Sequence, residues 1–188
     1  MASLQEPPPV ILPHIQIARA HWLLGALFLA IVLEAYLPIL RPDGRPEESR
    51  SVVIPWMLMI GGVGVWATTV FADVVHDMLI HTLWGDILFA AGALELIRRR
   101  GAYERPWLER VLPVAFVSTG VLFIVHVLIH PTPGDGWHVA LGTLLITGGM
   151  LELIRLQRHR PMPAIPPAVV PLAGFALALI AIPVAAAT

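Results

Sequence analysis

The sequence predicts an all-α integral membrane protein with six transmembrane helices, arranged as three tandem helical hairpins with the N- and C-termini outside. Three observations lead to this fold class: long apolar runs, an uneven distribution of arginine, and an internal repeat. The 188-residue chain is 57% hydrophobic and only 13% charged, whereas a soluble domain carries about 25% charged residues. Its apolar residues occur in runs of about 20, the length that crosses a bilayer core.

The apolar runs define the expected helices. We expect a disordered lead over 1–13, followed by a single six-helix domain (14–188) with spans at about 14–39, 52–75, 79–97, 111–130, 137–156 and 167–186. Proline and glycine mark the loops at 41–46 and 131–136. The turn between the second and third spans has neither residue, and we place it near 73–78 because an unbroken helix over 52–97 would be about 67 Å long.

Arginine placement predicts the orientation in the membrane. The chain has no lysine, and its arginines gather in the first, third and fifth loops: Arg41, Arg45, Arg50, Arg98, Arg99, Arg100, Arg105, Arg110, Arg155, Arg158 and Arg160. With six spans these loops share one side, and only Arg19 falls on the other. The positive-inside rule makes the arginine-rich side cytoplasmic, so we expect an inner (plasma) membrane protein whose termini face outward.

A repeated pattern relates the spans to one another. Spans three and five share a histidine, glycine, glutamate and arginine at constant spacing, and span one has a looser copy. The shared positions are His21, Gly25 and Glu34; His81, Gly85, Glu95 and Arg98; and His138, Gly142, Glu152 and Arg155. The even-numbered spans each open with Val-x-Pro. We therefore expect repeats over about 14–50, 51–108 and 109–160 with a final span at 167–186, a parallel arrangement found in other membrane proteins.

Seven of the eight histidines are expected at the outer membrane face. The candidate metal ligands there are His21, Asp73, His76, His81, His126, His130 and His138. His126 and His130 lie four residues apart on one face of span four, and Asp73 and His76 are placed at the outer end of span two. Imidazole and carboxylate are common ligands of transition metals. The pattern predicts a site for one or two ions of copper or iron, with zinc also compatible by ligand type.

Other polar residues on the outer side have simpler interpretations. We interpret His14, and His159 on the cytoplasmic side, as bystanders at the membrane interface, and Asp77 and Asp135 as helix caps. The alternative for the histidines within spans is polar contact between helices. We favour a functional role because ionisable groups within spans are rare and usually functional.

Three function classes remain open. The first is a membrane metalloprotein, either a metal-dependent oxidoreductase or a metal-handling protein. Its partners would be the lipid bilayer and an extracytoplasmic redox protein, a metal carrier or other membrane subunits. The second is a b-type cytochrome with bis-histidine haem ligation near the outer face. The third is a divalent-cation transporter.

The transporter would use Glu34, Glu95 and Glu152 as an inner ion relay. Glu95 and Glu152 each precede an arginine by three residues, so structural ion pairs are an equally supported interpretation. The absence of cysteine excludes disulfides, thiolate metal sites and iron–sulfur clusters, and no nucleic-acid signature is present.

Overall fold

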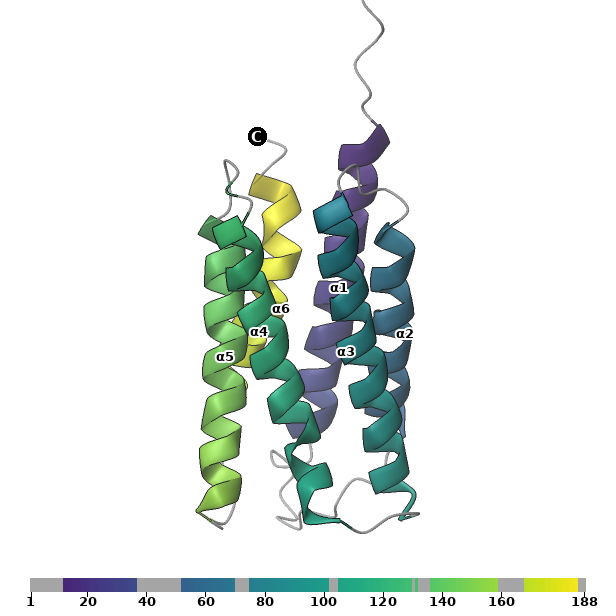
Figure 1. The fold of residues 1–188 in the computed structure, drawn as a ribbon, viewed down its shortest axis with the longest axis vertical. Coiled ribbons are helices and arrows are strands. Elements are labelled where there is room, and N and C mark those ends of the chain that lie inside the picture. Colours follow the sequence, from purple (N-terminus) through teal and green to yellow (C-terminus); the bar gives the residue numbers. More distant parts are fainter. Residues whose placement is uncertain are drawn as a thin grey trace, which may run out of the picture.

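The computed structural model is a bundle of antiparallel helices. It describes residues 12–36, 52–69, 75–101, 105–129, 131, 136–158 and 168–185, and these form helices without any strand. The elements are α1 (Leu12–Tyr36), α2 (Val53–Thr68), α3 (Val75–Arg99), the 3-10 helix η3 (Pro106–Arg110), α4 (Val111–Ile129), α5 (Gly136–Gln157) and α6 (Val169–Ala185). Consecutive helices run in opposite directions, so α1, α3 and α5 begin at the end of the bundle where α2, α4 and α6 finish (Figure 1). The all-α prediction is confirmed.

Three stretches in the described part of the chain are long and apolar enough to cross a membrane. They are Met78–Arg99, Pro106–Ile129 and Gly136–Gln157. Shorter apolar helical stretches are found at Trp22–Glu34, Val53–Thr68 and Val169–Ala181. Since apolar helices of about 20 residues match the hydrocarbon thickness, the fold is compatible with a membrane protein.

The boundary between the second and third helices differs from the sequence prediction. α2 ends at Thr68 and α3 begins at Val75, so the span expected over 52–75 is shorter and the next one starts earlier. His76 therefore lies in the first turn of α3, and its placement at the outer end of span two was wrong. Asp77 lies inside α3, so its assignment as the residue that caps this helix was also wrong.

Two threonines give a physical reason for the early end of α2. The Thr68 and Thr69 hydroxyls donate hydrogen bonds to the carbonyl oxygens of Val65 and Trp66, at 2.6 and 2.7 Å. Carbonyls in the last turn of a helix have no intrahelical partner, and threonine side chains can satisfy them locally. The helix can therefore stop here without the proline or glycine that usually marks a boundary.

The α-helices pack most extensively in three pairs: α2 with α3, α4 with α5, and α1 with α6. Glycines permit the first two pairs to approach closely. A Cβ atom at Gly62 would lie 2.7 Å from the carbonyl oxygen of Gly85, and one at Gly120 would lie 2.6 Å from that of Gly142. Because real Cβ contacts are longer than this, larger residues would force the backbones apart. The two pairs thus cross at corresponding glycines.

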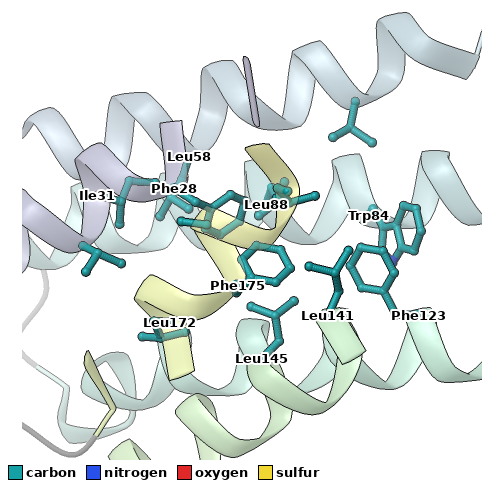
Figure 2. Close-up of a cluster of buried hydrophobic side chains, with 14 of the residues drawn as sticks. Phe28, Ile31, Leu58, Trp84, Leu88, Phe123, Leu141, Leu145, Leu172 and Phe175 are labelled. Carbon is teal, nitrogen blue, oxygen red and sulfur yellow. The ribbon is translucent and has the colours of Figure 1, made fainter. Parts of the chain in front are cut away.

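Apolar side chains from all six α-helices fill the centre of the bundle (Figure 2). Phe28 of α1 and Phe175 of α6 meet edge to face, with ring centroids 4.9 Å apart. Trp84 of α3 and Phe123 of α4 lie at one end of this core, with centroids 4.3 Å apart (Figure 2). Both rings also contact histidines, Trp84 those at 81 and 126 and Phe123 that at 138.

Candidate metal centre

The side chains of three of the seven predicted metal ligands are described: His81, His126 and His138. His81 lies in the second turn of α3, His126 in the last turn of α4, and His138 in the first turn of α5. Because these helices alternate in direction, the three positions fall at the same end of the bundle (Figure 1). The described arginines of α3 and α5, including Arg98 and Arg155, lie in the last turns of those helices, at the opposite end.

The other four predicted ligands are less fully described. The backbones of His21 and His76 lie in α1 and α3, and nothing is stated of their side chains. Asp73 and His130 lie outside the described residues. The prediction that these four residues contribute to the site therefore stays a prediction.

His126 and His138 bring two imidazoles together from neighbouring helices. Their ring centroids are 5.4 Å apart and the rings are inclined by 74°, and both residues are partly buried. Two imidazoles bound to one tetrahedral metal through bonds of about 2.0 Å have centroids roughly 5 Å apart. The spacing of this pair is therefore close to that of two ligands on a single ion.

Aromatic side chains support the histidine pair from the core side. The Phe123 ring stacks against the His138 imidazole, with centroids 5.7 Å apart. The Trp84 indole contacts the imidazoles of His126 and His81 edge to face, at 6.2 and 5.1 Å. Packing of this kind restricts the rotation of the imidazoles, and pre-orientation is what a ligand site requires.

The sequence interpretation missed Trp84 and Phe123, although a signal for them was present. Trp84 follows His81 by three residues and Phe123 precedes His126 by three. Side chains three residues apart on a helix are neighbours on its surface. The three-residue spacing was therefore sufficient to predict that Trp84 and Phe123 lie beside the candidate ligands His81 and His126.

Within the described part of the chain, no three histidine, aspartate or glutamate side chains converge as a metal site. His81 belongs to the same end of the bundle, where the Trp84 indole contacts both His81 and His126. The described site thus consists of two imidazoles in contact and a third histidine that shares the contact with Trp84. Since metal sites of this type need three or more donors, the pair alone does not complete a coordination shell.

The glutamates lie far along their helices from the histidines, and two of them form ion pairs. The buried Glu95 carboxylate accepts hydrogen bonds from Arg98 at 2.8 Å and from Arg99 at 2.6 Å. Glu152 is bound by both Nε and a terminal nitrogen of Arg155. Glu34 is partly exposed on α1. For Glu95 and Glu152 the geometry is that of the ion-pair interpretation.

No protein-family model matches the chain, and comparison with curated proteins and with solved structures likewise finds no match. The geometry of the histidine end of the bundle is therefore the feature that indicates a function.

Proposed function

We propose that this protein is an integral membrane metalloprotein that binds a transition-metal ion at its extracytoplasmic face. The observation that carries the proposal is the contact between His126 and His138, whose ring centroids are 5.4 Å apart. The two residues come from separate helices, and the glycine crossing of Gly120 and Gly142 holds these helices together. Such convergence of imidazoles from facing helices is how bundles build metal sites.

Further donors would complete the coordination shell. The candidates are His21, Asp73, His76, His81 and His130. A shell made mainly of imidazole, with one carboxylate, suits copper, iron or zinc. With copper or iron the site would serve redox chemistry, and with any of the three it would serve metal handling. In either role its partner would be an extracytoplasmic redox or metal-carrier protein, or another membrane subunit.

The orientation follows from the separation of charge along the bundle. Arg98, Arg99 and Arg155 lie at the end of the helices opposite to the histidines. The positive-inside rule assigns this arginine end to the cytoplasm, which turns the histidine end outward. We further propose that α1, α2 and α6, whose described apolar stretches are shorter, cross the membrane beside the other three helices, because they run antiparallel within the same bundle.

The histidine pair fits a bare ion better than a haem. Imidazoles on opposite faces of a haem iron have centroids about 6 Å apart, at bonds of about 2 Å, and the macrocycle lies between them. His126 and His138 are closer than this, and their rings meet edge to face. Rings in direct edge-to-face contact do not stand on opposite faces of a macrocycle, so the arrangement of this pair supports a bare ion over the cytochrome alternative.

The transporter alternative has less support from the geometry. A relay needs carboxylates that can take up and release an ion or a proton. Glu95 is 2% exposed and bound by two arginines, and Glu152 is paired with Arg155. Two of the three proposed relay groups are thus already neutralised by residues of their own helices.

Elemental analysis of the purified full-length protein tests the proposed function. Wild type, His126→Ala and His138→Ala are compared after incubation with copper, iron or zinc and removal of free metal. We expect bound metal in wild type and its loss in both variants, since each removes one of two neighbouring ligands. His159→Ala is the matched control and is expected to retain metal, because the sequence predicts this histidine on the cytoplasmic side, directly after Arg158.

The proposal fails if wild type binds none of the three metals, and two further outcomes would also overturn it. One is an unchanged metal content in both histidine variants. The other is a Soret band in the absorption spectrum of the purified protein, because this would establish haem in place of a bare ion.

A further inference from the structure

The indole nitrogen of Trp84 is a buried hydrogen-bond donor at the histidine end of the bundle. The Trp84 side chain is only 8% exposed, and its Nε1 atom has no hydrogen-bond acceptor among the described residues. A buried N–H group without an acceptor has lost its hydrogen bonds to water and gained none in return, which destabilises the folded state. Such groups in native proteins therefore call for an explanation, such as a bound ligand or ion.

Two other tryptophans show that indole groups in this fold do find acceptors. Trp66 Nε1 donates to the carbonyl oxygen of Thr82 at 3.3 Å, and Trp22 Nε1 donates to that of Ile180 at 3.0 Å. Both acceptors are backbone groups of a neighbouring helix. Trp84 is more buried than Trp22, so its N–H has the greater need of a partner.

The surroundings of Trp84 indicate what that partner is. The indole contacts the imidazoles of His81 and His126, and both are candidate ligands. A divalent metal ion bound by neutral imidazoles retains its positive charge, and this charge dominates the local electrostatics. A ligand that fills an open position on such an ion is favoured if it is an anion or a polarised water molecule.

We propose that the metal site takes a small anionic or oxygen-donor ligand, such as hydroxide, and that Trp84 Nε1–H donates a hydrogen bond to it. This inference rests on the proposed function, because the ligand is bound to the metal as well as to Trp84. Hydrogen bonds to charged acceptors are stronger than those between neutral groups. The Trp84 N–H group thus favours a metal-bound ligand that presents a lone pair to it. Phe123 and the apolar core behind it close the inner side of the site.

Azide binding to the copper(II)-loaded, full-length protein in detergent tests this inference. Azide is a small anion, and its binding to copper(II) is followed by absorption. We compare wild type with Trp84→Phe, which keeps an aromatic ring but removes the donor. We expect equal copper content in the two proteins and an azide dissociation constant about tenfold higher in Trp84→Phe, the effect of losing one charge-assisted hydrogen bond.

Two further variants complete the experiment. Trp66→Phe is the matched control, since the Trp66 N–H already has a backbone acceptor, and we expect its azide affinity to equal that of wild type. Trp84→Tyr returns a donor to the ring and is expected to recover part of the affinity. It also keeps the inference testable if Trp84→Phe does not fold.

The outcomes separate this inference from the proposed function. If wild type binds no copper, iron or zinc, both fail together. If Trp84→Phe keeps its copper and binds azide as wild type does, the hydrogen bond is refuted and the metal site stands. If Trp84→Phe folds but loses copper, the inference also fails, because Trp84 would then support the histidines and not the added ligand.

Discussion

Gly120 and Gly142 place the backbones of α4 and α5 in direct contact. A Cβ atom at Gly120 would lie 2.6 Å from the Gly142 carbonyl oxygen, and one at Gly142 would lie 2.7 Å from the Gly120 carbonyl oxygen. His126 follows this crossing in α4 and His138 precedes it in α5, each by about one to two helical turns. The crossing therefore sets the distance at which the two imidazoles meet.

Gly142→Ala should weaken both the fold and the metal site. The added methyl group meets backbone that cannot move without shifting a helix, and overpacking of this kind costs about 1–3 kcal/mol. We expect a lower midpoint of thermal unfolding in detergent and a weaker affinity for metal, because the histidines are moved apart.

Gly64→Ala is the control for this substitution, since a Cβ atom at Gly64 meets nothing within 4 Å. Alanine is favoured over glycine in a helix by about 0.5–1 kcal/mol, so this variant should be as stable as wild type or slightly more so. Equal losses in Gly64→Ala and Gly142→Ala would show that the crossing is not under steric constraint.

Glu95→Gln should destabilise the protein more than Glu152→Gln. Glu95 is 2% exposed and holds two arginines, whereas the side chains of Glu152 and Arg155 are 19% and 20% exposed. Removing one partner of a buried ion pair leaves uncompensated charge. We expect a loss of about 2 kcal/mol or more for Glu95→Gln, and about 1 kcal/mol or less for Glu152→Gln.

Thermal unfolding and metal content of the two glutamate variants are measured together. We expect both to bind metal as wild type does, because the carboxylates lie at the opposite end of the bundle from the histidines. Loss of metal binding in either variant at unchanged stability would contradict the ion-pair interpretation and support the relay.

Thr119→Val should be neutral or stabilising. The Thr119 side chain is buried, and its hydroxyl has no hydrogen-bond partner among the described residues. Valine has nearly the same shape without the polar group, so the substitution relieves a cost of about 1 kcal/mol. The midpoint of thermal unfolding should be unchanged or higher.

Thr143→Val is the matched control, because the Thr143 hydroxyl is exposed and donates to the Val139 carbonyl oxygen at 2.8 Å. We expect no gain in stability there. A clear loss of stability in Thr119→Val would instead show that its hydroxyl has a partner in the folded protein.

The proposed orientation can be tested with single cysteines, because the natural chain has none. Arg105 and Pro131 are both exposed and lie before and after the long helix α4, at opposite ends. A thiol reagent that does not cross membranes should label Pro131→Cys in intact cells or spheroplasts. It should label Arg105→Cys only after the membrane is permeabilised, since arginine-rich loops stay in the cytoplasm. The reverse pattern would place the histidine end in the cytoplasm.

Helix boundaries could be predicted well where the sequence contains local signals. The span predicted over 111–130 corresponds to Val111–Ile129, and that over 137–156 to Gly136–Gln157. Prolines and glycines lie between these two helices, at 131, 133, 134 and 136, and these residues act through their own backbone conformation. The boundary at Thr68 could not be placed in the same way, because it depends on hydroxyl hydrogen bonds that threonine can also make within a continuous helix.

Residue types and their spacing along the chain were enough to predict a helical, apolar protein with His81 and His138 at one end and the arginines at the other. These are consequences of residue type and of helical rise, which act locally. The contacts of His126 with His138, and of Trp84 with both His126 and His81, depend on how the helices pack and are seen only in the folded protein. Close backbone contacts, such as that of Gly120 with Gly142, determine which helices are neighbours and how each helix is rotated about its axis. These contacts join residues that are far apart in the sequence, so the order of residues along the chain does not reveal them.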